Sequence, residues 1–470
     1  MTHAGHAAAA AEAEAGWRRL VEKGLRGRPF SDLVSNTAEG FAIDPLTPPA
    51  APVSAFDRPA TPWMRLQRID HPDAGRSAAL SLEALNGGAD GLALVFSDAP
   101  GARGFGIAAD DLSDLLRDVV IDACPIRLET GIDGADIAAR FAAETEARRI
   151  DPALMQLSFG IDPLSAYAAC GQDFDRWPQT RAAIGALVAR LATKRFRGPF
   201  LAADGRRAHE AGADVASELA FVAAAYVAYL RLLAEAGLGD DVTGAAIEAV
   251  LAADSDQFMT IAKFRAARLM LRRIRSASGL TAGPIRIHGE TSWRMTTRRD
   301  PYSNLIRAAI AAFAAGAGGA DSLAVLPFTA PFGLAGAVPR RLALDTQSIL
   351  LEEANLYRVV DPSAGSGSIE ALTEDLAAEA WRRFQAIEAE GGLAASLRAG
   401  ALQGRIATER AARLAAIADG VVAIVGTNIF PAPASLPPDI EAPFPASQAE
   451  EPAFALPSIR LSQAAESEAA

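Results

Sequence analysis

Short runs of apolar residues alternate in this chain with longer segments in which apolar residues recur at the spacing of one helix face. The long segments are rich in alanine, which has the highest helix propensity, and they predict helices over residues 110–122, 214–236, 260–276 and 373–388. A further helix is predicted over 339–355. Short apolar strands between helices are typical of a parallel sheet that is buried on both faces.

Eight of the short apolar runs predict strands. These runs are residues 91–96, 125–129, 154–159, 199–203, 247–252, 284–288, 322–328 and 358–361. Eight strand–helix units favour an α/β fold closed into a (β/α)8 TIM barrel, which presents functional side chains at the carboxyl ends of its strands. An open, doubly wound sheet is the alternative architecture, and the run 247–252 is also compatible with a helix.

Both ends of the chain differ in composition from the middle. Residues 1–16 predict a disordered tail, and residues 17–61 predict an arm that begins with a helix over 17–23 and ends in a proline-rich linker. Residues 62–430 are assigned to the barrel. Residues 431–470 are rich in Pro, Ala, Glu and Ser without periodicity, so we expect a second disordered tail there.

Composition narrows the class of protein. Half of the 470 residues are hydrophobic, which is ample for a large core, and the formal net charge of −12 provides no basic field for nucleic acid or an anionic membrane. No apolar run reaches the roughly 18–20 residues of a membrane span, and the N-terminus has no basic region ahead of an apolar one. A cytoplasmic protein without a nucleic-acid or membrane partner is therefore predicted. Two distant cysteines indicate neither a disulfide framework nor a zinc site, and no metal is expected.

Two clusters of polar residues follow predicted strands. His288 ends the sixth strand and is followed by Glu290 and Ser292, where a barrel places functional groups, although a buried histidine with satisfied hydrogen bonds is an equal alternative. Beyond the fourth strand, Arg206 and Arg207 precede His209. The two arginines could bind phosphates at a pocket mouth, or they could form surface ion pairs of little energetic value.

Several longer motifs occur in one order along the chain, and together they are specific. They are Thr37-Ala38-Glu39-Gly40, Pro62-Trp63 with Gln67, Glu210-Ala211-Gly212-Ala213, Ala262-Lys263-Phe264-Arg265-Ala266-Ala267-Arg268, Thr291-Ser292-Trp293, Asp300-Pro301-Tyr302-Ser303-Asn304 and Asp361-Pro362. In these residues the chain resembles the methylmalonyl-CoA mutase family, and in particular its small (β) subunits, from about Trp17 to about Phe430.

The resemblance implies a fold and a chemistry. Active members rearrange a CoA thioester by a radical route that adenosylcobalamin initiates. Their barrel binds the ester through its centre, and a C-terminal domain holds the corrin through a histidine in an Asp-x-His-x-x-Gly motif. This sequence lacks that motif, so we expect no C-terminal cobalamin-binding domain here. In the assembled enzyme a partner subunit would hold the adenosylcobalamin.

Two departures from the family pattern fall on residues that the resemblance makes catalytic. Where active subunits read Gly-Tyr-His before the Glu-Ala-Gly-Ala motif, the histidine is replaced by Arg207 and its tyrosine by Arg206. A second substrate-contacting tyrosine, which follows Pro-Trp, is replaced by Arg68. A permanently charged guanidinium cannot act as a switchable acid. The barrel is therefore expected to be inactive, with Arg206, Arg207, His209, His288, Glu290 and Ser292 lining a degenerate pocket.

The resemblance then implies a partner and a role. The chain would be the small, non-catalytic subunit of an isomerase, and it would form a heterodimer with the methylmalonyl-CoA mutase large subunit and stabilise it. An active acyl-CoA mutase barrel that works with a separate cobalamin-binding protein is one alternative. A free-standing module that binds CoA esters is another.

Overall fold

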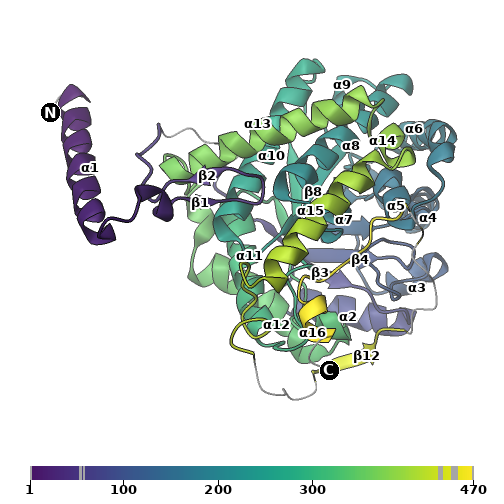
Figure 1. The fold of residues 1–470 in the computed structure, drawn as a ribbon. Coiled ribbons are helices and arrows are strands. Elements are labelled where there is room, and N and C mark those ends of the chain that lie inside the picture. Colours follow the sequence, from purple (N-terminus) through teal and green to yellow (C-terminus); the bar gives the residue numbers. More distant parts are fainter. Residues whose placement is uncertain are drawn as a thin grey trace.

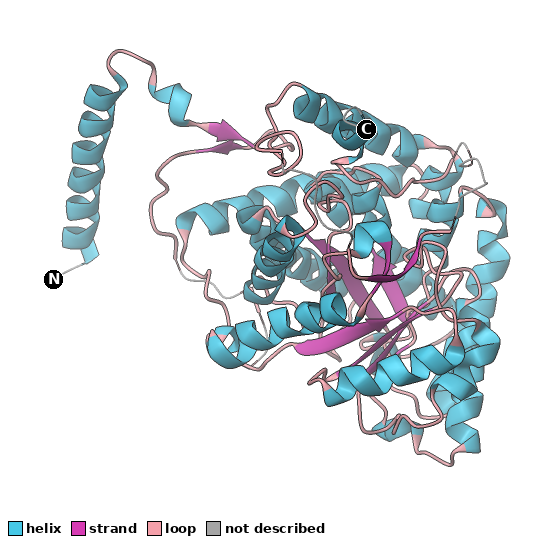
Figure 2. Ribbon diagram, turned by 90° about the horizontal axis from the view of Figure 1, so that it is seen from below, coloured by secondary structure: helices cyan, strands magenta, loops and turns pink. Residues whose placement is uncertain are grey.

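The computed structural model describes residues 3–51, 55–56, 59–431, 438–445, 452 and 454–467. Eight parallel strands form its centre, surrounded by helices (Figure 1, Figure 2). The strands are β3 (Met64–Ile69), β4 (Gly91–Val95), β5 (Ile126–Glu129), β6 (Leu157–Ser158), β7 (Leu201–Asp204), β8 (Ile247–Ala253), β9 (Arg286–Thr291) and β10 (Ser322–Ala324).

The strands follow one another around the sheet in chain order, and β10 pairs with β3. The remaining gap, between β6 and β7, is bridged just beyond β6, where the Ile161 amide donates to Phe200 O at 3.2 Å and the Ala202 amide donates to Ile161 O at 3.1 Å. The predicted TIM barrel is therefore confirmed, and the open sheet is excluded.

Helices connect the strands and continue beyond them. They are α2 (Ala74–Asn86), α3 (Leu112–Leu115), α4 (Gly134–Ala147), α5 (Pro163–Cys170), α6 (Trp177–Thr193), α7 (Arg206–Glu210), α8 (Val215–Glu235), α9 (Asp240–Thr243), α10 (Gln257–Ala277), α11 (Ser303–Ala317), α12 (Ala337–Ser348), α13 (Gly367–Ala389), α14 (Leu393–Arg398), α15 (Ala401–Ala418) and α16 (Gln463–Ser467). Helix α8 is long and apolar enough to span a membrane, but most of it is buried against the strands and neighbouring helices, as in the core of a globular domain.

One predicted strand was assigned to the wrong segment. Residues 358–361 instead run from the end of a short 3-10 helix (Leu356–Arg358) through an irregular bend, where the carboxylate of Asp361 accepts from the buried Arg265 and from the Ala55 amide at 2.9 Å. The missing strand is β3, whose residues Arg65 and Arg68 kept it from resembling an apolar run. The helix predicted over 110–122 is also shorter, with only α3 and a preceding 3-10 turn.

The N-terminal arm has two parts. Helix α1 (His3–Leu25) stands away from the barrel, as Figure 1 shows, and it includes residues 3–16, where a disordered tail was predicted. A small hairpin of β1 (Ser35–Asn36) and β2 (Ala42–Ile43) follows and contacts the body, where Glu39 accepts from the Val215 amide at 2.9 Å. Part of the predicted linker, residues 52–54 and 57–58, lies outside the described residues.

The described part of the C-terminal region differs from the disordered tail that composition predicted over residues 431–470. Residues 432–437, 446–451, 453 and 468–470 of that predicted tail lie outside the described residues. Strand β12 (Ile440–Pro443) pairs antiparallel with β11 (Gly333–Ala335). Residues 454–467 then cross the carboxyl-terminal end of the barrel, which we call the mouth. There the amides of Leu456, Ile459 and Leu461 donate to backbone oxygens of the body at 2.8–3.0 Å. Individual backbone hydrogen bonds to the body hold this segment even though its sequence has no periodicity.

Candidate functional site at the barrel axis

Charged side chains occupy the interior of the barrel. Arg127 and Glu129 lie two residues apart on β5, so both point to the same face of the strand, toward the axis. The Nε atom of Arg127 donates to Glu129 at 2.6 Å, and its other end pairs with Glu248 of β8, across the barrel. This ion pair joins opposite walls of the barrel.

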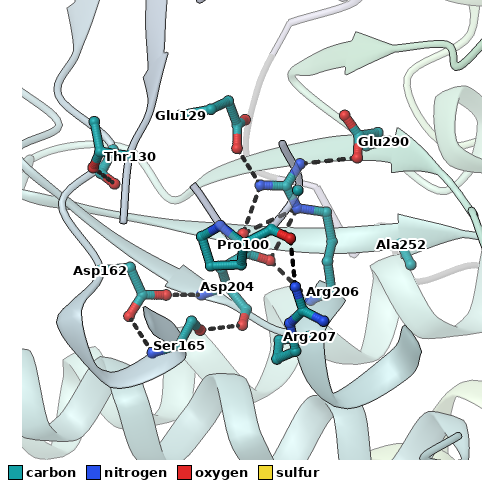
Figure 3. Close-up of polar contacts among 12 residues, drawn as sticks. Pro100, Glu129, Thr130, Asp162, Ser165, Asp204, Arg206, Arg207, Ala252 and Glu290 are labelled. Atoms are coloured by element: carbon teal, nitrogen blue, oxygen red, sulfur yellow. Dashed lines mark hydrogen bonds and ion pairs between the residues drawn. The ribbon is translucent and has the colours of Figure 1, made fainter. Parts of the chain in front are cut away.

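Arg206 fills the axis above that pair. It begins α7 directly after β7, and its Nε atom donates to Asp204 at 3.0 Å. Its terminal nitrogens reach Glu290 of β9 at 3.0 Å and Glu129 of β5. Figure 3 shows the guanidinium between these carboxylates. One side chain therefore ties three strands together across the centre.

A third arginine continues the network toward β3. Arg68 binds Asp70 at 2.8 Å and Glu290 at 3.3 Å, and it also donates to Gly101 O. Arg340 of α12 reaches the other oxygen of Asp70 at 3.1 Å. Glu290 thus accepts from Arg68 and Arg206 together.

Arg207 faces a different environment from its neighbour. It donates to Pro100 O and, at 3.5 Å, to Leu456 O of the segment that crosses the mouth. Beside it, Arg103 pairs with Glu210 at 2.6 Å while its guanidinium stacks 4.2 Å from the ring centre of Trp293. The mouth is closed by these contacts.

Charges in this network balance. Its six arginines face six carboxylates, namely Arg68, Arg103, Arg127, Arg206, Arg207 and Arg340 with Asp70, Glu129, Asp204, Glu210, Glu248 and Glu290. Burial alone would raise the pKa of Glu129, but Arg127 and Arg206 outweigh it and hold that pKa well below its usual range. The pKa of Glu210 is lowered in the same way by Arg103 and Arg207.

Little space remains around these side chains. The cavity beside Arg206, which Glu129, Asp204 and Glu290 also line, has a volume of about 30 Å3. That is room for about two water molecules. The axis of the barrel is packed with ion pairs and is not an open channel.

His209 belongs to α7, and its ring lies outside the axial network, against α8. Its Nδ1 atom is 3.1 Å from Glu218, and its Nε2 atom is 2.8 Å from the Ser292 hydroxyl and 3.3 Å from Asp254. Lys263 binds the same Glu218 at 2.7 Å. Both ring nitrogens are engaged and the ring is fully buried, so His209 holds elements together and does not face the mouth.

The structure separates the other predicted pocket residues. Strand β9 runs on to Thr291, so His288 lies near the amino-terminal end of the barrel, level with Ser322 of β10, and not at the mouth where it was expected. Glu290 belongs to the axial network, and Ser292 to the His209 cluster. Only Arg206, Arg207 and Glu290 of the predicted set line the cavity at the axis.

Sequence reasoning missed most of the acidic partners. Arg127 and Glu129 carried a usable signal, because two charges two residues apart in a buried strand must face a barrel interior together. Glu248 carried no such signal, since its partner Arg127 lies on a strand far away in the sequence. Asp204 lies only two residues from its partner Arg206.

Comparisons with known proteins agree with this fold. The methylmalonyl-CoA mutase family model matches residues 62–468. The chain is 37% identical to the methylmalonyl-CoA mutase small subunit of Streptomyces virginiae over 475 residues, covering 96% of this chain and 74% of that protein. It is 36% identical to a probable small subunit of Mycobacterium tuberculosis H37Rv, covering 87% of this chain and 68% of that protein.

A relative that is not named as a small subunit matches more distantly. The methylmalonyl-CoA mutase of Escherichia coli K12 is 30% identical over 457 residues, covering 88% of this chain and 63% of that protein. The family model matches residues 62–468, and a relative is 37% identical over 96% of this chain, so this chain belongs to the methylmalonyl-CoA mutase family.

Proposed function

We propose that this chain is a non-catalytic small subunit, which binds a large mutase subunit and stabilises it in an enzyme that interconverts methylmalonyl-CoA and succinyl-CoA. The observation that carries the proposal is the position of Arg206. Its guanidinium and three carboxylates fill the axis through which, by the resemblance, active barrels bind their substrate.

The residues at the catalytic positions support an inactive barrel. Arg207 stands in place of the family histidine and is held by two backbone oxygens. Arg68 stands in place of the tyrosine and is held by Asp70 and Glu290. A guanidinium is a far weaker acid than the imidazole or phenol that it replaces, so neither side chain can act as a switchable proton donor to a substrate carbonyl.

The residues at the mouth do not fit adenosylcobalamin. Residues 454–467 cross the face where a corrin would have to approach the barrel, and the nearby His209 has both ring nitrogens engaged. The Asp-x-His-x-x-Gly motif, through which the resemblance implies that a corrin is held, does not occur in this sequence. We therefore assign the cofactor to the large subunit and derive no chemical step from it in this chain.

The arm supports a partner. Helix α1 stands apart from the barrel and leaves Leu20 72% exposed, while Leu33 and Leu46 farther along the arm are also exposed. Exposed apolar residues on a projecting element are typical of surfaces that become buried in a complex. An obligate heterodimer would bury about 2,000–5,000 Å2 in total, and an arm that wraps the partner would contribute to that area.

Association with the large subunit tests the proposal. Co-expression with the tagged large subunit from the same source should yield a stable one-to-one complex. Removing residues 1–45 or introducing Leu20→Asp should weaken the complex, whereas Glu22→Gln, an exposed change on the same helix, should not. Failure of the intact chain to form any complex would contradict the proposed function. Unchanged binding after the arm is removed would contradict only the role of the arm.

A further inference from the structure

A cavity lies outside the barrel wall, between α2 and α12, which both pack on β3 (Figure 1). We call it the lateral cavity, and its volume is about 150 Å3. An apolar cavity of about this volume accommodates one molecule of the size of benzene. Nothing in the proposed structural role of the chain uses this space.

The floor of the lateral cavity carries a buried amide nitrogen without a partner. Arg68 of β3 points to the barrel axis, so its neighbour Gln67 points outward, toward the two helices. Gln67 is 6% exposed, and its Nε2 atom makes no hydrogen bond with any residue that the structure describes. Buried polar atoms in native proteins nearly always have a partner, so this N–H group requires an acceptor.

The walls around this nitrogen are apolar. Ile69, Leu80, Ala84 and Leu344 line the cavity, and each is at most 7% exposed. A buried water molecule needs about 2–4 polar partners, and these four side chains offer none. Water therefore fills the cavity poorly, whereas an apolar ligand with one acceptor atom would satisfy both the walls and the amide.

The charged side chains that line the cavity are already paired within the chain. The pairs are Arg68 with Asp70 at 2.8 Å, Arg340 with Asp70 at 3.1 Å, Arg341 with Asp345 at 2.9 Å and Glu83 with Arg76 at 2.8 Å. An ionic ligand would have to break one of these pairs or remain without a counterion. The charge pattern therefore favours a neutral ligand.

Two arginines separate the lateral cavity from the mouth. Arg68 and Arg340 line this cavity on one side and the hollow beside Trp293 at the mouth on the other. Glu83 and Arg341, at the outer rim between α2 and α12, are exposed. A ligand therefore reaches the lateral cavity from the outer surface of the barrel and not from its axis.

We propose that the lateral cavity binds a small, neutral, largely apolar molecule of about the size of benzene. Its apolar body lies against Leu80 and Leu344, and its one acceptor atom takes the hydrogen bond of Gln67 Nε2. The inference goes beyond the proposed function and does not depend on it, because the cavity belongs to this chain alone and is separated from the mouth. No covalent step is involved.

A matched pair of probes tests the hydrogen bond. Fluorobenzene and 3-fluoropyridine share a ring and a fluorine, but only the second has a ring nitrogen that accepts a hydrogen bond. Fluorine NMR titration of the full-length chain at pH 7, where 3-fluoropyridine is neutral, should show saturable binding of both probes. Gln67→Met removes the donor and should weaken 3-fluoropyridine at least about fivefold while fluorobenzene binds no more weakly than before. Gln179→Met, at an exposed position on α6, should change neither affinity.

A second pair of variants tests the location. Ala84→Leu fills the cavity and should abolish binding of both probes, whereas Ala79→Leu, at an exposed position on the same helix, should leave both affinities unchanged. Circular dichroism checks that each variant is folded. Hydrogen–deuterium exchange needs no substitution, and 3-fluoropyridine should protect residues 80–87 and 337–344 of the wild type.

Four outcomes would each overturn the inference. Two concern the wild type, namely the absence of saturable 3-fluoropyridine binding and protection confined to other parts of the chain. The other two are an unchanged affinity for 3-fluoropyridine in folded Gln67→Met and retained binding in folded Ala84→Leu. If neither variant folds, the protection experiment on the wild type still decides.

Discussion

Replacing Arg206 by methionine should destabilise the protein strongly, because it removes the cation shared by two buried carboxylates, Glu129 and Glu290, and the half-buried Asp204. Asp204, Glu129 and Glu290 all contact this guanidinium, whose side chain is 11% exposed. Methionine keeps much of the length and packing of the side chain but leaves uncompensated negative charge in the barrel. Breaking a buried pair from one side typically costs about 3–5 kcal/mol, and we expect a loss in that range at pH 7.

Urea unfolding monitored by circular dichroism measures this loss. The deficit should shrink as the pH falls from 7 to 4, because without Arg206 the pKa of Glu129 rises and protonation removes the excess charge. Adding Glu290→Gln to Arg206→Met should recover at least about 1 kcal/mol, since one uncompensated charge is gone. Arg358→Met, at an exposed site, should change stability by less than about 0.5 kcal/mol.

A single result would refute this reasoning. If Arg206→Met is as stable as the wild type within about 1 kcal/mol at pH 7, the carboxylates must be solvated, and the axis cannot be the closed network described above.

Three further predictions follow from other parts of the structure. Leu456→Ala should lower the free energy of unfolding in urea by about 2–3 kcal/mol, because Leu456 is 2% exposed in the hydrophobic core. An unchanged free energy would mean that the C-terminal segment is detached from the mouth. Burial alone would raise the pKa of Glu218, but Lys263 and His209 outweigh it and lower that pKa to about 2. The ionised Glu218 therefore stabilises the fold above pH 4.5, and this contribution is lost as the pH falls toward 2. The free energy of unfolding of Glu218→Gln should therefore be about 3 kcal/mol below that of the wild type at pH 7. Urea unfolding measured across pH should show this difference narrowing below pH 4.5. A difference that stays constant with pH would contradict the ion pairing of Glu218. Arg207→His with Arg68→Tyr should show no mutase turnover in a coupled assay, because Arg206 still fills the axis, and measurable turnover would overturn the inactive-barrel account.

The barrel could be predicted because its strands are apolar on both faces. β4 and β8 are completely buried; β4 shows as a continuous apolar run, and Glu248 alone interrupts the apolar run of β8. Strand β3 could not be found in this way, because Arg65 pairs with Asp90 outside the barrel while Arg68 joins the network inside. Polar groups on both faces erase the pattern on which strand prediction depends.

The candidate site was predictable only where the family motif covers it. Arg68, Arg206 and Arg207 were identified as replacements of functional residues, but nothing local indicated that Arg206 would meet Glu129 and Glu290. Those partners lie on strands far apart in the sequence, and only closure of the barrel brings them together. His288 was misplaced for a related reason, since its role depends on where β9 ends.

The C-terminal region shows the limit of composition as a guide. Its sequence satisfies the usual criteria for disorder, yet β12 pairs with β11, and Ser462 donates to Thr296 O at 2.8 Å. Order there depends on backbone bonds to a preformed barrel surface, which a sequence read segment by segment does not reveal.

Turnover by separated and combined subunits tests the central claim most directly. Methylmalonyl-CoA and adenosylcobalamin are supplied to this chain alone, to the large subunit from the same source alone, and to the co-purified complex. We predict turnover by the complex and none by this chain without the large subunit, including when a separate cobalamin-binding protein is added. Turnover by this chain without the large subunit would contradict the claim that its barrel is inactive.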